Sequence, residues 1–207
     1  MTTAYARDDE GPRSKRAAIL QAAVEQFGED GYEATKWSVV ADRVGIGQTA
    51  LYHYFESKAH CLLTIMRLEL QQSHDRFASA IKDAPSPREA LHDALFHSYD
   101  LTELEVLQVR VLVANTSILG NRRKSKKEET ERLAARSLVA QIERDWTALL
   151  QRGMDEKEFP ERDAHFLAQM VLGLVVSVWR WYRPNGPLSI DDVREFATGC
   201  AERMVLN

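Results

Sequence analysis

Residues 34–58 read ATKWSVVADRVGIGQTALYHYFESK and contain two short helical patterns separated by a turn. In the first pattern, at about 36–44, apolar residues recur at the spacing that places them on one face of a helix. Gly45 follows, where glycine adopts a left-handed backbone without steric cost. The second pattern covers about 48–54 and ends in aromatic residues. Two short helices joined by a tight turn predict a helix-turn-helix.

A helix-turn-helix needs a small residue where its helices approach, a residue tolerant of the turn, and an apolar contact from the second helix. Ala41, Gly45 and Leu51 meet these needs at offsets of four and six residues. We expect Thr35 to be the N-cap of the first of these helices. Trp37 is interpreted as a large core residue, with a DNA contact as the alternative.

The composition bounds the class of protein. The chain has 207 residues and a net charge of −4, and residues 13–58 hold six Lys or Arg against six Asp or Glu. Any nucleic-acid binding must therefore depend on where charges lie. Cys61 and Cys200 lack the spacing of a metal site and are expected to be free thiols of a cytoplasmic protein. The N-terminus is polar, and the longest apolar run, 170–179, is too short for a membrane span.

The remainder of the chain predicts an all-α fold of about nine helices. Residues 1–12 are expected to be disordered, 13–57 to form a three-helix domain, and 58–207 to form a helical bundle. Gly28 and Gly31 are expected to end the first helix, and Gly153 the long helix after Ser125. Outside 34–58, the predicted helices cover residues 14–27, 58–82, 87–100, 103–119, 126–152, 162–183 and 190–205.

The pattern AT-x5-A-x3-GI-x4-LYHYF-x-SK, together with ILQAAVEQFGEDGYEAT before it, resembles the DNA-binding domain of the TetR family of bacterial transcriptional repressors. The resemblance covers about residues 15–66. It implies an all-α homodimer whose N-terminal heads bind a palindromic double-stranded operator. It also implies a C-terminal domain that holds a small-molecule effector, with no cofactor and no enzymatic activity.

The resemblance assigns roles within the head. Gln48, Thr49 and His53 are expected to contact base edges, glutamine being suited to adenine. Tyr52 and Lys58 are expected to contact phosphate, whereas Tyr54 supports the core and the groove edge. Other candidates for the DNA backbone are Arg13, Lys15, Thr35 and Lys36. Gly47 and Ala50 depart from the family pattern, because neither offers a side-chain hydroxyl.

The C-terminal domain offers a less specific pattern. Candidate residues of an effector pocket are His97, Tyr99, Val111, Asn115, Trp146, Phe166, Met170 and Trp179, each of which could equally be plain core. The last two helices are predicted to form the dimer interface as a four-helix bundle with the partner. Its expected apolar residues are Val171, Val175, Val178, Phe196, Cys200 and Met204.

The segment VSVWRWYRPNGPLSIDDV, at 176–193, resembles the tail of TetR-family regulators of lipid, sterol or fatty-acid breakdown, several of which sense acyl-CoA thioesters. The resemblance suggests an acyl-CoA or another lipid-derived metabolite as the effector. Cations that could meet its phosphates, or equally lie at a surface or dimer rim, are Arg122, Arg123, Lys124, Arg180 and Arg183.

Two other function classes stay open at this point. An enzyme would need a catalytic or metal motif, and the sequence contains no HExxH, CxxC, GxSxG or P-loop pattern. His92 and His97, near Asp93 and Asp100, are a weak candidate metal site. A helical module that binds another protein is the second alternative, and salt-sensitive binding to duplex DNA would separate it from a regulator.

Overall fold

The computed structural model describes residues 12–184 and 186–207, and within these ranges the chain forms nine α-helices, one 3-10 helix and no strand. The all-α prediction is confirmed. The N-terminal segment that was predicted to be disordered lies outside the described residues, except for Pro12, which begins the first helix.

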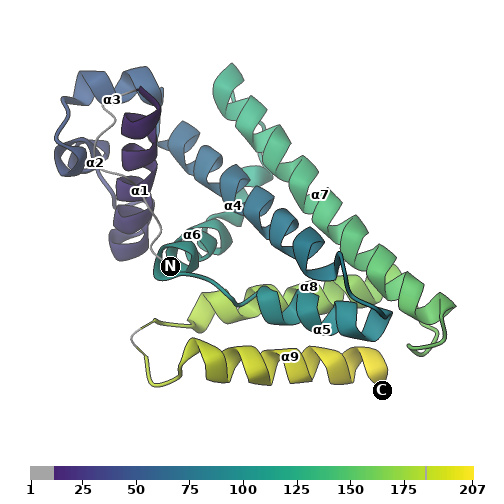
Figure 1. Cartoon of the computed structure of the whole chain (residues 1–207). Coiled ribbons are helices and arrows are strands. Elements are labelled where there is room, and N and C mark those ends of the chain that lie inside the picture. The colour runs from purple at the N-terminus through teal and green to yellow at the C-terminus, as the bar shows by residue number, and fades with distance from the viewer. Residues whose placement is uncertain (1–11, 185) are drawn as a thin grey trace.

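The helices form a head and a body (Figure 1). The head consists of α1 (Pro12–Asp30), α2 (Trp37–Val44) and α3 (Gln48–Tyr54). The body consists of α4 (Lys58–Ile81), α5 (Pro87–His97), α6 (Glu103–Ala114), the 3-10 helix Thr116–Leu119, α7 (Lys126–Asp155), α8 (Ala164–Trp181) and α9 (Ile190–Leu206).

Five helices of the body begin after a Ser or Thr residue that caps them. Each cap accepts a hydrogen bond from the backbone N–H three residues later, which satisfies one of the donors left free at a helix start. The caps are Ser57, Ser86, Thr102, Ser125 and Ser189. Thr102 and Ser189 form complete capping boxes with Glu105 and Asp192.

Two glycines that were predicted to end helices lie inside them instead. Gly28 lies within α1, and a Cβ there would stand 3.1 Å from Leu107 Cδ2 of α6. Gly153 lies within α7, and a Cβ there would lie 2.1 Å from the ring of Phe159. Both glycines therefore permit close packing against a neighbouring side chain. Gly31, with a φ of 84°, does follow the end of α1.

Other boundaries differ by a few residues. The helix predicted to reach residue 119 stops at Ala114, and the chain tightens into the 3-10 helix after Asn115. The helices predicted to end near residues 100 and 183 stop at His97 and Trp181. Helix ends fray and are the least certain part of a pattern-based prediction.

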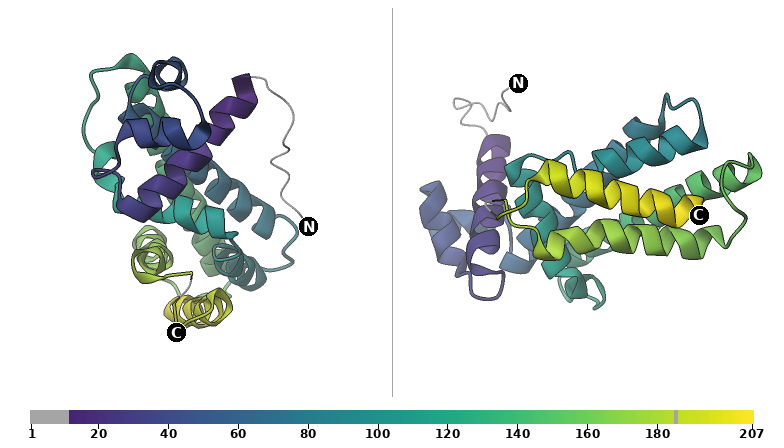
Figure 2. Two further views of the ribbon diagram at one scale, coloured as in Figure 1. Left: turned by 90° about the vertical axis from the view of Figure 1, so that its left-hand side faces the viewer. Right: turned by 90° about the horizontal axis from the view of Figure 1, so that it is seen from below.

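The body is built around α4 and α7, which run in the same direction away from the head, while α8 and α9 lie side by side along the bottom of the view in Figure 1 (Figures 1 and 2). Helix α8 is long and apolar enough to pass as a membrane span by composition alone. Its buried side chains belong to the core shared with α5, α6, α7 and α9, as those of a core helix do.

Apolar packing crosses the predicted domain boundary at residues 57 and 58. Cys61, Leu62 and Met66 of α4 belong to the same cluster as Ile19 and Phe27 of α1. Helix α4 therefore begins as part of the head's core and continues into the body. Both cysteines are free thiols, with Cys61 buried and Cys200 half-buried.

Candidate functional site

The turn between α2 and α3 has the geometry that the sequence predicts. Gly45 adopts a left-handed backbone, with φ 71° and ψ 36°. The N–H of Gly45 donates to the carbonyl of Asp42, and the N–H of Ile46 donates to that of Ala41, which closes the end of α2. Ala41 and Leu51 are almost completely buried, so the two helices are fixed to each other by apolar contact.

Helix α3 presents one polar, solvent-exposed face. Gln48, Thr49, Tyr52 and His53 are all exposed, and Tyr52 retains 48% of its accessible surface. Spacings of one, four and five residues place these side chains on adjoining positions of one helical face. Tyr54 is half-buried and packs against the head core. The exposed face therefore offers several hydrogen-bonding side chains, which are the groups that read base edges in a major groove.

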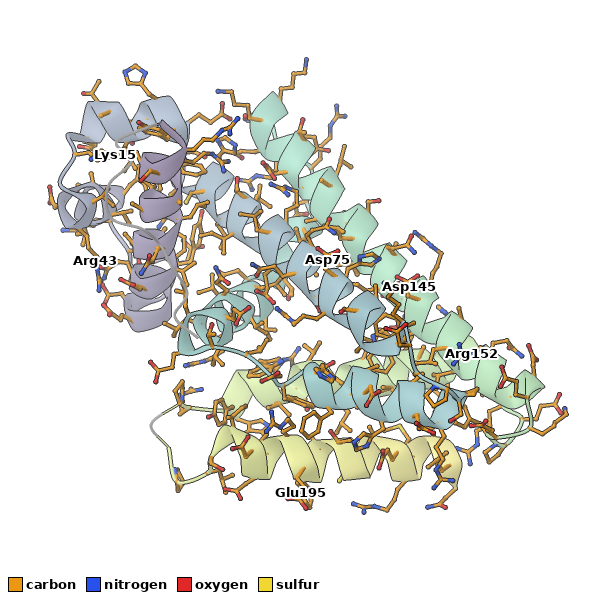
Figure 3. The ribbon with its side chains drawn as sticks, viewed as in Figure 1. Lys15, Arg43, Asp75, Asp145, Arg152 and Glu195 are labelled. Atoms are coloured by element: carbon orange, nitrogen blue, oxygen red, sulfur yellow. The ribbon has the colours of Figure 1, made fainter. Side chains whose placement is uncertain are left out.

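The cations of the head differ in how free they are to meet phosphate. Arg43 is held by Glu25 at 3.1 Å and Glu29 at 3.2 Å, which ties α2 to α1. Arg13, Lys15 and Lys36 are exposed and form no ion pair with a described residue. In Figure 3, Lys15 lies on the part of α1 next to α3, whereas Arg43 lies lower on the head.

The sequence predicts that Lys58 contacts phosphate, but in the structure its ammonium bonds to backbone carbonyls of the head. Its Nζ donates to the carbonyls of Tyr32 (2.6 Å), Thr35 (2.9 Å) and Glu33 (3.2 Å). The ammonium also lies 4.4 Å from the centroid of the Tyr32 ring. All three N–H donors of the lysine are therefore engaged, and α4 is anchored to the α1–α2 loop through its first residue.

The prediction that Thr35 caps α2 is wrong. Its side chain is buried, and Oγ1 donates to the carbonyls of Gly31 (2.8 Å) and Gln26 (3.3 Å), so the hydroxyl closes the α1–α2 loop. Lys36 is the N-cap residue and makes no side-chain cap bond. Burial also removes the Thr35 hydroxyl from reach of a phosphate oxygen. Trp37 is buried, as its interpretation as a core residue requires.

The body contains a partly open chamber of about 350 Å³ lined by α4, α6, α7 and α8. Most of its wall is apolar, and Trp146 and Trp179 are its largest side chains. A concave, mostly apolar cavity with a few placed polar groups is typical of a small-molecule site. The apolar wall also includes Leu70, Val109, Leu112, Val113, Val139, Ile142, Leu172, Val175 and Val176.

One buried ion pair lies in the chamber wall. Oε1 of Glu69 accepts from Arg76 at 2.8 Å, while Oε2 is buried and has no hydrogen-bond partner in the described structure. Glu69 is only 2% exposed. Burial raises the pKa of Glu69 to about 7, against the opposing effect of Arg76. A lone acceptor oxygen in an apolar wall is a natural contact for a polar group of a ligand.

The predicted pocket residues separate into four groups. Trp146 and Trp179 line the chamber, as expected. Val111 and Asn115 line a second cavity at the junction of head and body, and Tyr99 is buried against Trp179 without lining either.

The prediction is wrong for the remaining three pocket residues, which do not line the chamber. Phe166 and Met170 are 65% and 50% exposed on α8, because they lie on its outer face. His97 is exposed at the end of α5, with Nδ1 2.8 Å from the carbonyl oxygen of Asp93. None of the three lines the chamber.

The predicted dimer residues also divide. The prediction is wrong for three of them, Val171, Val175 and Val178. Their side chains point into the core, and a buried side chain cannot supply a subunit interface. Phe196 is 72% exposed, and Cys200 and Met204 are half-buried. The outer surface of α8 and α9 instead presents Phe166, Met170, Trp181 and Phe196.

Sequence reasoning missed Glu69 and Arg76. Their signal was present, because Glu69 falls on the apolar face of α4 beside Met66 and Leu70, where a charge is unusual. The histidine candidate for a metal does not assemble: His92 pairs with Glu202 at 2.7 Å. Among the described residues, no three His, Cys, Asp or Glu side chains come together as a metal site would need.

Two family models match the chain. Residues 19–65 match the model described as bacterial regulatory proteins of the tetR family, and residues 105–205 match the tetracyclin repressor-like C-terminal domain. Together they cover most of the sequence.

Relatives and solved structures agree with these matches. The HTH-type transcriptional repressor KstR2 of Mycolicibacterium smegmatis is 28% identical over 183 residues, which span 88% of this chain and 86% of that protein. The structure of the ketosteroid transcriptional regulator KstR2 of Mycobacterium tuberculosis has a TM-score of 0.79 at 24% identity, covering 97% of this chain and all of that one.

A third similar structure was solved with ligands. AibR in complex with isovaleryl coenzyme A and operator DNA has a TM-score of 0.76 at 18% identity, covering 90% of this chain and 97% of that one. This likeness shows a shared fold. With the two family models matching head and body in the expected order, the chain belongs to the TetR family of bacterial regulatory proteins.

Proposed function

We propose that the protein is a homodimeric transcriptional repressor that leaves a palindromic operator when a small, lipid-derived effector binds its body. The observation that carries this proposal is the path of α4. Its first residue, Lys58, is bonded to the loop of the reading head, and Glu69, eleven residues later, lines the chamber. At 1.5 Å per residue the two points are about 16 Å apart on one rigid helix.

Helix α4 provides a physical route from effector to DNA. If α4 can adopt two placements in the body, a ligand that binds one of them better increases the fraction of molecules with that placement. Because the head is bonded to the start of α4, such a shift changes the distance between the two α3 helices of a dimer. An operator has a fixed half-site spacing, so it binds one arrangement of the heads best.

The effector class is supported by the chamber and by the relatives. The chamber wall is mainly apolar, which suits a lipid-derived group. The relative KstR2 is named as a repressor, and AibR, which shares the fold, was solved with isovaleryl coenzyme A and operator DNA. An acyl-CoA thioester is therefore the class to test first. A thermal-shift panel in which no acyl-CoA stabilises the protein, well above micromolar concentration, would contradict it.

Selection of bound duplexes from a random DNA pool tests the DNA-binding function. The expected result is a palindrome whose affinity falls steeply with salt. Gln48→Ala should relax the preference at one base pair of each half-site, whereas Gln151→Ala, on the exposed surface of α7, should change nothing. Recovery of no common sequence would favour a helical module that binds another protein.

A further inference from the structure

A second cavity lies between part of the head and part of the body. It is a groove of about 660 Å³. The head contributes residues 27, 28 and 30–34, at the end of α1 and in the α1–α2 loop. The body contributes the later part of α6 and the end of α8. This loop is the one whose carbonyls hold Lys58, so the groove adjoins the point where α4 is anchored.

The two walls of the groove carry opposite charge. The body wall holds Arg110, Arg180 and Arg183, and none of the three forms an ion pair with a described residue. The head wall holds Asp30 and Glu33. Nη1 of Arg183 donates to the carbonyls of Tyr182 (3.1 Å) and Arg180 (3.4 Å), which keeps this guanidinium against the end of α8.

The arginines are close enough to repel one another. Burial lowers the pKa of Arg110, and the nearby charge of Arg183 lowers it further. Like charges gathered in a concave surface destabilise each other until an anion binds between them. Arginine offers planar, paired N–H donors that match phosphate oxygens, so a phosphate group is the natural anion for this wall.

The groove and the apolar chamber are neighbours. Val113 and Trp179 each line both cavities. A single molecule with an apolar part and a phosphorylated part could therefore occupy the chamber with the first and the groove with the second.

We propose that the groove binds the phosphate groups of the effector, whose acyl part occupies the chamber, and that this contact moves the head directly. The inference rests on the proposed effector class, the acyl-CoA thioesters, and adds the site for the phosphorylated half. Phosphate in the groove is attracted by the arginines and repelled by Asp30 and Glu33 across from them. It weakens the attraction between the two walls and shifts the α1–α2 loop relative to the body.

Calorimetric titration of the full-length dimer with coenzyme A, octanoyl-CoA and octanoate tests this inference. We expect Arg110→Gln and Arg183→Gln each to weaken both CoA ligands about tenfold, the loss of one charged hydrogen-bonding contact. Octanoate, which has no phosphate, should bind these variants as it binds the wild type. Glu33→Gln should tighten both CoA ligands severalfold, because a repelling charge is removed.

Two controls keep the outcome interpretable. Arg144→Gln removes the same charge from the exposed surface of α7, lines neither cavity, and should leave every titration unchanged. Thermal unfolding of each variant establishes that it is folded. Effects of the same sign in the arginine and Glu33 variants would overturn the inference, because an anion between the walls is attracted by the arginines and repelled by Glu33.

The result also separates this inference from the proposed function. If octanoyl-CoA releases wild-type protein from its operator but Arg110→Gln and Arg183→Gln respond at the same concentration, the groove assignment is wrong and the regulator stands. If wild-type protein binds neither coenzyme A nor octanoyl-CoA, the groove assignment is wrong whatever the DNA result. If the wild type binds CoA ligands with the predicted variant effects but no DNA, the proposed function fails alone.

Discussion

At the residue scale, a side chain's face on a helix could be predicted from the sequence, but its partners could not. Gln48 and His53 are exposed because spacing along α3 fixes their direction once Leu51 is buried. Thr35 and Lys58 took roles that depend on the conformation of the α1–α2 loop, which no periodic pattern encodes. The charge of Glu69 on the apolar face of α4 is visible in the sequence, but only the fold shows that its carboxylate reaches a cavity.

Lys58 gives a prediction that separates its two roles. Removing its ammonium in Lys58→Ala leaves three loop carbonyls without a donor, so we expect the free energy of unfolding to fall by about 1–3 kcal/mol. Urea denaturation measures this change. Lys36→Ala, an exposed lysine on the same head, should lower operator affinity and leave stability unchanged. If Lys58→Ala is as stable as the wild type, the three carbonyl contacts do not stabilise the fold, and phosphate binding is the only role left for Lys58.

Glu69 gives a prediction of pH dependence. Its pKa is raised to about 7 in the folded protein, from 4.5 when exposed, so the folded state holds the proton more tightly than the unfolded state. The stability from this proton is complete below about pH 4.5 and is lost as pH rises through 7. The loss is on the order of 3 kcal/mol at most, because each pKa unit corresponds to about 1.4 kcal/mol.

Glu69→Gln removes this titration while keeping the side-chain shape. The melting temperature of the variant, minus that of the wild type, should therefore rise between pH 5 and pH 8. Differential scanning calorimetry at a series of pH values gives this difference. A difference that stays constant would show that Arg76 keeps the carboxylate ionised throughout.

At the element scale, helix starts were predicted better than helix ends. A cap is a local device: Ser57, Thr102 and Ser189 each bond to a backbone N–H three residues away, and the sequence displays both partners. Gly28 and Gly153 looked like helix ends because glycine often terminates helices. Here they lie inside α1 and α7, where Leu107 beside Gly28 and Phe159 beside Gly153 leave little room for a Cβ.

Gly153→Ala tests this reading of α7. Alanine favours a helix by about 1 kcal/mol over glycine, but its Cβ would overlap the buried Phe159 ring, at a cost of about 1–3 kcal/mol. We expect net destabilisation in urea denaturation. In a Phe159→Ala background the same change should be neutral or stabilising. If Gly153→Ala changes stability equally in both backgrounds, contact with Phe159 does not explain why a glycine lies at this position.

At the scale of the whole molecule, the order of head, connecting helix and bundle could be predicted from sequence. The bundle's inward and outward faces could not, because α8 is apolar on both. Val171 and Val178 were predicted to meet a partner and lie in the core, whereas Phe166 and Met170 were predicted to line a pocket and face outward. A helix that is apolar on both faces lacks the polar stripe that would mark its outward face in the sequence.

The outward apolar surface predicts the dimer contact. Phe196 is 72% exposed on α9, and burying it against a partner would remove its ring from water. Analytical ultracentrifugation of the wild type should give about twice the 23.6 kDa chain mass. Phe196→Asp should shift this toward the monomer, and Leu133→Asp, on the exposed surface of α7, should not. A Phe196→Asp protein that remains fully dimeric would place the interface elsewhere.

The proposed regulator couples an effector in the body of one dimer to DNA on its heads. The most direct test is fluorescence anisotropy of the selected operator, titrated with and without saturating octanoyl-CoA. We predict that the ligand raises the operator Kd by about 5- to 150-fold, and that the operator raises the ligand Kd by the same factor. A dimer that binds no duplex DNA, or one whose operator Kd is unchanged by the bound ligand, would contradict the account.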